Sequence, residues 1–435
     1  MSQHPTEDTP RLAALRHRDF RLLWAGETVS VIGAQMQLIA INWHVYALLK
    51  GDAVVLSVLG QDVALDAGAL GLGVLGLVRV VPIVVFALVG GMLADIRDRR
   101  QVMLWTRVAA AVFAAILAAI TFTDHATVAA IYLLTAAGAA VSAFDAPAQQ
   151  SIVPHLVPPA HMTNAISLNT LQWQIGTIIG PAIAGLLIRD QDIGMVYAIT
   201  ALTFAVAVGA VRALRYRGHA AASTAGLGCS ALLEGLRFTY RSRIIWSTML
   251  LDFFATFFSS ARTMLPIVAD QVLGLGPEGY GLLATAQPVG ALVAGAATSL
   301  RRDIYHQGAV LLVSVAVYGL ATAFFGVATA FALSYFFFAL TGAGDTVSTV
   351  IRGTIRQMMT PDALRGRMVG VNMIFFMGGP QLGELEAGLV AAAFGAPFAI
   401  FTGGLATVLL TAWIAWRYPG LRRYTSDALA AQRAA

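Results

Sequence analysis

Charged residues are scarce in this 435-residue chain, and lysine and cysteine are almost absent from it. Only 12% of the residues are charged and 58% are hydrophobic, with a mean hydropathy of +0.73. A water-soluble domain of this size carries more charge than that. The single cysteine, Cys229, excludes an internal disulfide. The single lysine, Lys50, follows Leu49, so the chain lacks the Gly-Lys-Ser/Thr core of a phosphate-binding P-loop.

The residue clusters of an enzyme or a metalloprotein are also missing. The eight histidines are scattered, and His155 and His161 stand at a weak spacing for a metal site. No nucleophile has a recognisable base beside it. We therefore expect no enzymatic activity, no metal and no cofactor. The net charge of +5 is explained better by membrane topology than by nucleic acid binding.

Long apolar segments fill the chain instead. A bilayer core about 30 Å thick needs about 20 apolar residues per helical crossing, and these segments are too long for barrel strands. We predict an all-α membrane protein with twelve transmembrane helices in two pseudo-symmetric six-helix bundles. The predicted spans are residues 20–48, 69–94, 101–121, 127–148, 163–188, 193–214, 244–270, 279–300, 307–327, 330–351, 367–393 and 395–417.

Arginines gather at alternate ends of these spans. Clusters precede the first span and follow the second, sixth, eighth, tenth and twelfth, whereas the opposite loops offer little beyond Lys50 and Arg189. The positive-inside rule then places both termini in the cytoplasm of a multi-pass inner-membrane protein.

A central linker divides the chain. Within it, residues 232–240 are amphipathic, so we expect a helix lying on the inner membrane face, with partner binding as the alternative. The predicted parts are a cytoplasmic tail (1–19), an N-terminal bundle (20–215), the linker (216–242), a C-terminal bundle (243–417) and a second tail (418–435).

The two predicted bundles repeat each other in sequence. Leu134–Ser142 and Leu340–Ser348 agree at six of nine positions, and Gly180–Leu186 is similar to Gly383–Leu389. The offsets of 206 and 203 residues are nearly equal, and each pair lies in equivalent spans. Parallel repeats of this kind are typical of a transporter whose midplane substrate site, between the halves, is exposed alternately by rocking. An inert helical scaffold is the alternative.

The loop after the second span carries a motif of a known family. Gly91-Met-Leu-Ala-Asp95-Ile-Arg-Asp-Arg99-Arg100 resembles the loop 2–3 signature of the major facilitator superfamily, with departures at Ile96 and Asp98. The resemblance implies that Asp95, Arg99 and Arg100 form a cytoplasmic latch stabilising the outward-open state. A charge cluster that only sets topology is the alternative.

Three further segments are similar to the drug and siderophore efflux branch of that superfamily, which is enterobactin exporter-like. They are Phe20–Tyr46, Asp145–Ala165 and Arg356–Arg367, although Ala34 stands where the branch often has an acid. The resemblance implies export, and it places Asp145 and Arg356 in equivalent latch loops.

The fifth predicted span resembles the antiporter motif of drug exporters. Its residues are Gly176, Gly180, Pro181 and Gly185, with Ala184 in place of one glycine. Small residues at this spacing let two helices approach closely, and a proline bends a helix. Ordinary helix packing explains the same pattern equally well.

Ionisable side chains inside the spans are the candidate functional groups, because each needs a partner, a water cavity or a proton. We predict that Glu384 or Glu386, with Asp345 nearby, carries the coupling proton. The two glutamates point about 200° apart on a helix, so both cannot face one cavity. The alternative is a buried ion pair with Arg79 or Arg262.

Glu27 and Asp252 lie at similar depths in the first span of each half. We predict either proton coupling or an inner-gate role in which they pair with Arg18 or Arg243. Arg107, near the inner end of the third span, is a further charge partner.

Aromatic residues suggest an apolar cavity for a bulky amphiphile, although lipid-facing or packing roles are the alternative for most. The candidates are Trp43, Trp173, Phe254, Phe258 and Phe376. We predict a secondary active transporter, a monomer that exports a drug-like or siderophore-like small molecule by proton antiport, with protons and membrane lipid as its other partners. The alternatives are an importer or facilitator of a small metabolite, and a non-transporting receptor or scaffold.

Overall fold

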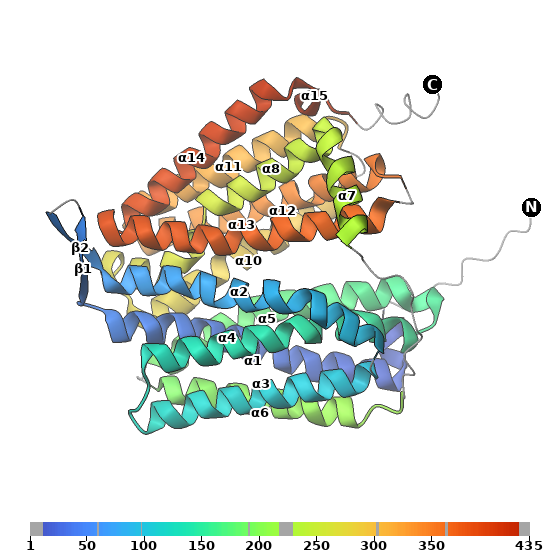
Figure 1. Ribbon diagram of the computed structural model, residues 1–435, viewed down its shortest axis with the longest axis horizontal. Helices are drawn as coiled ribbons and strands as arrows, with labels where there is room; N and C mark the ends of the chain where they lie inside the picture. Colours follow the sequence, from blue (N-terminus) through green and yellow to red (C-terminus); the bar gives the residue numbers. More distant parts are fainter. Residues whose placement is uncertain are drawn as a thin grey trace, which may run out of the picture. The chain divides into compact units, whose positions relative to one another are not determined.

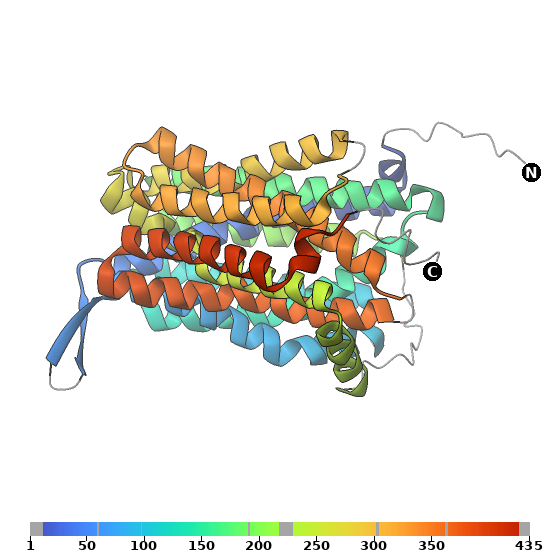
Figure 2. The same cartoon turned by 90° about the horizontal axis from the view of Figure 1, so that it is seen from above.

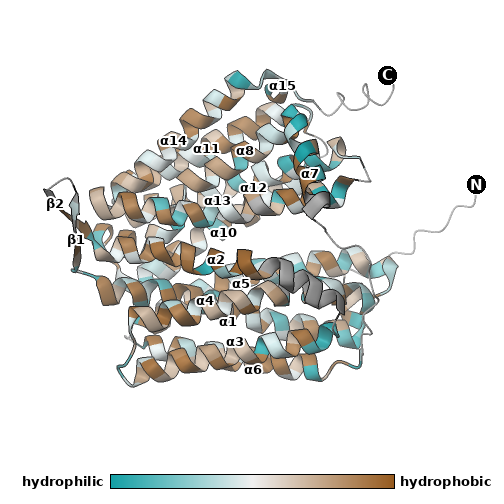
Figure 3. Ribbon diagram, viewed as in Figure 1, coloured by the Kyte–Doolittle hydropathy of each residue, from teal (hydrophilic) through white to brown (hydrophobic). Residues whose placement is uncertain are grey.

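The protein is almost entirely helical in a computed structural model, which describes residues 12–58, 61–96, 98–189, 192–216, 229–301, 304–361 and 364–425. Within these ranges, nine helical stretches are long and apolar enough to cross a membrane. Three more helices, α1, α12 and α13, are of similar length but carry more polar residues. The predicted all-α membrane class is confirmed, and twelve spans are compatible with these elements. Hydrophobic residues predominate along most of the helices, whereas α7 is rich in hydrophilic ones (Figure 3).

Contacts divide the chain into two compact units. Unit 1 contains Met1–Ala40 and Val81–Thr224, and unit 2 contains Ile41–Val80 and Ala225–Ala435. The first two helices therefore contribute residues to both units. The bundle limits predicted from the sequence, 20–215 and 243–417, differ from this grouping by contacts and remain a prediction.

Unit 1 is built from antiparallel helices (Figure 1). Short 3-10 turns at Ala13–Arg16, Val153–His155 and Pro159–His161 connect them. Side chains cap three of the helices, because Asp98, Thr127 and Asp192 accept backbone N–H bonds at the starts of α3, α4 and α6. The helices are α1 (Arg18–Leu49), α2 (Ala67–Ile96), α3 (Arg99–Phe122), α4 (Val128–Ile152), α5 (Met162–Arg189) and α6 (Ile193–Arg212).

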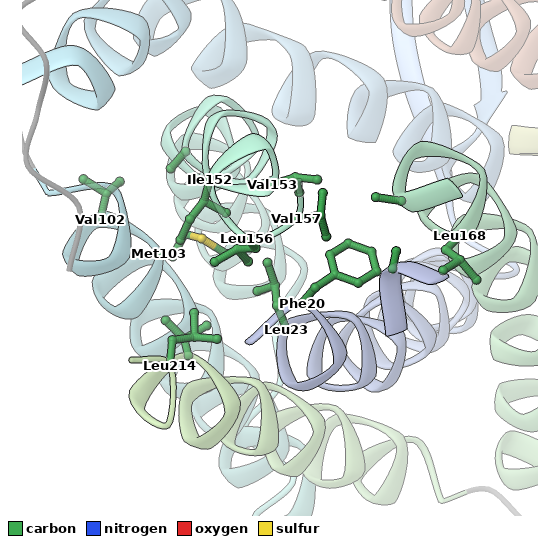
Figure 4. Close-up of a cluster of buried hydrophobic side chains, with 14 residues drawn as sticks. Phe20, Leu23, Val102, Met103, Ile152, Val153, Leu156, Val157, Leu168 and Leu214 are labelled. Atoms are coloured by element: carbon green, nitrogen blue, oxygen red, sulfur yellow. The ribbon is translucent and has the colours of Figure 1, made fainter. Parts of the chain in front are cut away.

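A buried apolar cluster joins the ends of these helices (Figure 4). Phe20 comes from the start of α1, Met103 from the start of α3, and Ile152 from the end of α4. Leu168 of α5 and Leu214, just after α6, complete it. Starts and ends therefore alternate at one end of unit 1, as expected for helices that cross a membrane up and down.

Unit 2 holds the remaining helices. The predicted seventh span is broken: after α8 the chain forms a 3-10 turn at Ala261–Met264, the short α9 (Leu265–Ile267) and a π turn at Val268–Val272. Pro266 lacks the backbone donor that a continuous helix needs here. The other helices are α7 (Cys229–Arg241), α8 (Arg243–Phe258), α10 (Gly276–Leu300), α11 (Gln307–Val327), α12 (Phe331–Met359), α13 (Arg365–Phe394), α14 (Ala396–Arg417) and α15 (Pro419–Arg422).

The sequence repeat is also a repeat of packing. In unit 1 α3 packs on α4 and α6, and in unit 2 the corresponding α11 packs on α12 and α14. A Cβ built on Gly180 of α5 would lie 2.8 Å from the carbonyl oxygen of Ile32 in α1. A Cβ built on the equivalent Gly383 of α13 would lie even closer to the carbonyl oxygen of Phe257 in α8. The same glycine contact thus joins the first and fifth helices of each half.

A β-hairpin lies between α1 and α2, where the sequence predicted only a loop. Strands β1 (Ala53–Val58) and β2 (Gln61–Asp66) are antiparallel, with Ala53 opposite Asp66 and Val55 opposite Ala64. The hairpin projects beyond the ends of α1 and α2 (Figures 1 and 2). Asp66 closes it onto the membrane helix, because its carboxylate accepts a 2.6 Å hydrogen bond from the backbone N–H of Ala69 in α2.

Candidate ion-binding clusters of the two units

A polar cluster in unit 2 surrounds Glu384, and we call it the Glu384 cluster. Arg79 of α2 lies 3.6 Å from the Glu384 carboxylate of α13, with both side chains about 15% exposed. Arg79 also donates a 2.6 Å hydrogen bond to Asn42, whose amide donates to the Tyr280 hydroxyl at 3.3 Å. Arg262 interacts electrostatically with Glu384 and Arg79, and its buried Nη2 has no hydrogen-bond partner among the described residues. The cluster therefore contains two cations and one anion.

Glycines let α2 approach Glu384 closely. A Cβ built on Gly76 would lie 2.7 Å from the Cβ of Glu384, and one built on Gly73 would lie 2.8 Å from the Cα of Gly388. Because neither glycine has a side chain, the two helices touch through their backbones. This contact allows Arg79, one turn beyond Gly76 on α2, to reach the carboxylate.

Glu386 lies apart from this cluster. It is half-buried in α13, and no ion pair or hydrogen bond joins its side chain to another residue in the described part of the chain. The structure thus separates the two glutamates chemically: Glu384 faces arginine, and Glu386 is a carboxylate without a cation.

A second cluster, the Glu27 cluster, lies in unit 1. Arg107 of α3 contacts Glu27 of α1 at 2.6 Å and Asp145 of α4 at 2.7 Å. Thr106 donates to Asp145 at 2.6 Å, and Gln149 donates to Glu27 at 3.2 Å. Glu27 is only 2% exposed, and its Oε1 has no hydrogen-bond partner among the described residues. Two carboxylates therefore share a single guanidinium.

A third cluster, the Asp252 cluster, occupies the equivalent depth of unit 2. Arg352 of α12 contacts Asp252 of α8 at 2.9 Å and Asp345 at 3.5 Å. Arg356, one turn further along α12, contacts Asp252 at 3.5 Å and also donates to Asn372 of α13. Two acids and two arginines balance in this cluster, in which Asp252 and Arg352 are buried and the Asp345 side chain is 42% exposed.

Glu27 and Asp252 do not pair with the arginines predicted for an inner gate. Arg18 pairs with its neighbour Asp19 at 3.0 Å, and Arg243 has no ion pair with any described carboxylate. Glu27 and Asp252 pair instead with arginines on other helices, 80 and 100 residues away along the chain. Depth in a span was readable from the sequence, but the rotation of each helix about its axis was not.

The other predicted groups are placed as follows. Asp345 contacts Arg352, and no contact joins it to Glu384 or Glu386 among the described residues. Asp145 and Arg356 lie within α4 and α12 rather than in loops. Four features of these clusters were not predicted from the sequence: Asn42, Tyr280, Gln149 and the pairing role of Arg352. A polar residue inside an apolar span is the feature by which Asn42 could have been found.

The antiporter-like motif packs α5 against α1. Gly176 lies against Val31, and Gly180 against the backbone at Ile32 and the side chain of Gln35. Pro181 and Gly185 are buried within α5. Close helix packing thus accounts for the two contacting glycines.

The predicted cavity aromatics differ in their surroundings. Trp43 stacks on Tyr280, with ring centroids 6.0 Å apart, which places it beside the Glu384 cluster. Phe254 stacks on Phe258 within unit 2. Trp173 of unit 1 and Phe376 of unit 2 are among the exposed large hydrophobic residues, at 57% and 52%.

Comparison with known families identifies the chain. A family model described as a transmembrane secretion effector matches residues 9–434. The chain belongs to this family. It is a transporter of the major facilitator type, and the twelve-helix fold of that superfamily explains the repeat of glycine contacts in the two halves.

Among relatives of this chain, the enterobactin exporter EntS of Shigella boydii serotype 4 (strain Sb227) is 24% identical over 362 residues. The match covers 82% of this chain and 81% of that exporter. EntS of Shigella boydii serotype 18 (strain CDC 3083-94 / BS512) is 25% identical over the same length.

Solved transporter structures share the fold of this chain. A bacterial homolog of the human lysosomal transporter Spinster, inward-facing and occupied, gives a TM-score of 0.71 at 12% identity and covers 94% of this chain and 99% of its own. The nucleoside transporter NupG gives 0.70 at 14% identity and covers 94% of this chain and 100% of its own.

The structure describes the side chains of only part of the loop 2–3 motif. Gly91 and Asp95 lie in the last turns of α2, and their side chains fall outside the described residues. Arg99 donates to the carbonyl oxygen of Ser151 at 3.2 Å, and Arg100 donates to that of Arg212 at 2.6 Å. Both arginines therefore hold the ends of other helices of unit 1, at the arginine-rich end.

Proposed function

We propose that this transporter exports an acidic, siderophore-like small molecule in exchange for protons. Carriage of a small molecule follows from the family, and the direction, the coupling ion and the substrate class are the proposed part. The proposal rests on the opposite charge excess of two buried clusters: the Glu27 cluster has one acid too many, and the Glu384 cluster has one arginine too many.

The Glu27 cluster supports the proton. Two carboxylates that share one arginine in a buried site repel each other, and a proton on either one neutralises the set. Gln149 donates a hydrogen bond to Glu27, and Thr106 donates one to Asp145. Protonation of either carboxylate would therefore change the hydrogen bonds that it forms with its donors. Coupling to a proton gradient needs a site of this kind.

Glu386 is the second proton-site candidate. A carboxylate inside the hydrocarbon region without a cation is costly, and protonation removes the cost. Glu384 is less suited, because Arg79 and Arg262 stabilise its ionised form. The proposal therefore places the coupling proton on Glu27 or Asp145, with Glu386 as a second carrier, and not on Glu384.

The Glu384 cluster supports an acidic substrate. Arg262 has a buried guanidinium N–H without an acceptor among the described residues, and one carboxylate leaves the two arginines with a positive charge in excess. An anionic oxygen of a ligand would supply the missing acceptor. Trp43 and Tyr280 beside it offer aromatic faces, which suits an aromatic acid such as a catecholate. The similarity to the enterobactin exporter EntS supports a siderophore-like ligand.

We also propose that the arginine-rich end of the chain is cytoplasmic and that the membrane is a bacterial inner membrane. The arginine ends of α3 and α6 meet at one end of unit 1, where Arg100 bonds the carbonyl oxygen of Arg212. Positive charge gathered at one end is the pattern that the positive-inside rule describes.

Uptake into proteoliposomes tests the proposal, with enterobactin as the probe and an imposed pH gradient, acidic inside. Because substrate leaves by antiport in a cell, the subset of inverted molecules should fill the vesicles faster with the gradient than without it. A protonophore should remove the acceleration. Glu27→Gln and Asp145→Asn should lose the acceleration and keep substrate exchange at zero gradient.

The matched control is Glu234→Gln, because Glu234 is an exposed carboxylate on α7 that pairs with Arg367. It should keep full acceleration. The proton proposal is wrong if wild-type uptake ignores the gradient, or if Glu27→Gln, Asp145→Asn and Glu386→Gln all remain fully coupled. Flux that proceeds only down the concentration gradient would identify a facilitator instead.

A further inference from the structure

A cavity of about 590 Å³ opens in unit 2 where α7, α8, α14 and α15 come together. The start of α8 and the end of α14 meet α7 and α15 at one end of unit 2 (Figures 1 and 2), and contacts join α7 to α8 and α15 to both α8 and α14. Its walls include Arg241, Arg243 and Arg417, with the aromatic rings of Trp246 and Tyr418 between them. The cavity is separate from the three ion-binding clusters.

No carboxylate among the described residues neutralises these three arginines. Within the described residues, no carboxylate forms an ion pair with Arg241, Arg243 or Arg417. The guanidinium of Arg417 lies over the ring of Tyr418, 5.6 Å from its centroid, and so still has its N–H groups available. Helix α8 begins at this cavity, and the Ser242 side chain does not cap it. Three cations and a helix N-terminus face one space in which the described residues place no anion.

The equivalent cavity of unit 1 contains its own anion. Asp19 is the second residue of α1, and its carboxylate accepts the backbone N–H groups of Arg215 at 3.0 Å and Tyr216 at 3.1 Å and pairs with Arg18. The second residue of α8 is Ile244, which lines the unit 2 cavity.

The two positions correspond in the repeat. Glu27 and Asp252, which occupy the same depth in their clusters, each come eight residues after Asp19 and Ile244. The contacts of Gly180 with Ile32 and of Gly383 with Phe257 fix the same register. The second half therefore has isoleucine where the first half has a carboxylate, and no described carboxylate compensates its arginines.

The surroundings of the cavity are those of a lipid surface. Helix α7 exposes Leu233, Leu236 and Tyr240, which lie three and four residues apart on one face and are 64%, 41% and 66% exposed. Trp416, in the last turn of α14, is 76% exposed. Apolar helix faces and tryptophans at this level lie at the boundary between headgroups and acyl chains. These apolar faces would not contribute to the binding of a free ion.

We infer that the α7–α8–α14 cavity binds the phosphate headgroup of an anionic phospholipid. Arg241, Arg243 and Arg417 would contact the phosphate oxygens, and the acyl chains would extend over the apolar face of α7. Basic pockets at a membrane surface bind such headgroups, and each basic residue contributes about fivefold in affinity. The bound lipid would hold α7, and with it the central linker, against unit 2.

Lipid binding to the purified full-length chain tests this inference. Delipidated protein in a neutral detergent is titrated with phosphatidylglycerol, phosphatidylcholine or inorganic phosphate. Native mass spectrometry counts the bound lipid molecules, and the midpoint of thermal unfolding is measured in parallel. Phosphatidylglycerol should bind and raise the midpoint, whereas phosphatidylcholine and inorganic phosphate should not. Replacing Arg241, Arg243 and Arg417 together by glutamine should weaken phosphatidylglycerol binding on the order of 100-fold.

Ile244→Asp is the sharpest variant, because it gives the cavity the internal anion that unit 1 already has. It should abolish the preference for phosphatidylglycerol over phosphatidylcholine, whereas Ile244→Asn, of the same size without the charge, should keep most of it. Equal binding of both lipids by wild type overturns the inference. So does full phosphatidylglycerol affinity in the triple glutamine variant, or protection by inorganic phosphate alone. Should Ile244→Asp not fold, Ile244→Asn and the triple variant still decide.

Discussion

Gly73 and Gly388 touch each other across α2 and α13: a Cβ built on Gly73 would lie 2.8 Å from the Cα of Gly388. A side chain at either position would meet backbone, which cannot rotate away. This contact is what brings the arginine of α2 to the glutamate of α13, so it supports both the packing of unit 2 and its Glu384 cluster.

Gly388→Ala should therefore destabilise the protein by about 1–3 kcal/mol, the usual cost of overpacking. Thermal unfolding in detergent, followed by circular dichroism, measures it. Gly378→Ala is the control on the same helix, because a Cβ there would lie 3.8 Å from the nearest atom of Phe253. That control should be neutral or slightly stabilising. Equal midpoints for both variants would contradict the packing argument.

Arg352→Gln should cost about 3 kcal/mol, because it leaves the buried Asp252 with only the more distant Arg356. Glu234→Gln breaks an ion pair whose side chains are 35% and 56% exposed, so it should cost about 1 kcal/mol or less. Denaturation midpoints of the two variants provide the comparison. If the exposed pair mattered as much as the buried one, the neutral-cluster interpretation would be wrong.

Arg79 and Glu384 should show strong coupling in a double-mutant cycle. Arg79→Gln leaves a carboxylate beside Arg262, and Glu384→Gln leaves two arginines facing each other, so each single change should destabilise unit 2. The double variant should be less destabilised than the sum by about 1–3 kcal/mol. Strict additivity of the unfolding free energies would show that the 3.6 Å contact contributes nothing.

The single lysine and the single cysteine report membrane orientation without any engineering. Lys50 stands at the hairpin end of α1, with its side chain 52% exposed, and Cys229 is the first residue of α7. Because the two lie at opposite ends of the predicted spans, a membrane-impermeant amine reagent should modify Lys50 from outside the cell. An impermeant maleimide should modify Cys229 only in inverted vesicles. Modification of both residues from one side would refute the proposed topology.

Helix positions were predictable because lipid imposes one solution on a long apolar segment. The predicted span 193–214 is α6 (Ile193–Arg212), and span 307–327 is α11 (Gln307–Val327). The amphipathic stretch 232–240 lies within α7 (Cys229–Arg241). The break after Phe258 was missed, since Pro266 alone does not decide between a kink and an interruption.

The partners inside the clusters were not predictable. Which of the buried acids meets Arg107 depends on how α1, α3 and α4 are rotated about their axes, and small residues with little periodicity leave that rotation unspecified. The hairpin was missed for another reason. Val54 and Val55 belong to a short apolar segment that follows Asp52 and is interrupted by Asp62, and beside apolar runs of twenty residues such a segment is interpreted as a loop.

Two helices belong to both units. The first passes from unit 1 to unit 2 after Ala40, and the second returns from unit 2 to unit 1 between Val80 and Val81, next to Pro82. Proline removes one backbone hydrogen bond and weakens a helix against bending. Any movement of one unit against the other therefore bends or rotates these two continuous helices. We expect part of the hinge of the transport cycle to lie in α1 and α2, in the first quarter of the chain, in addition to the central linker, where the units also join.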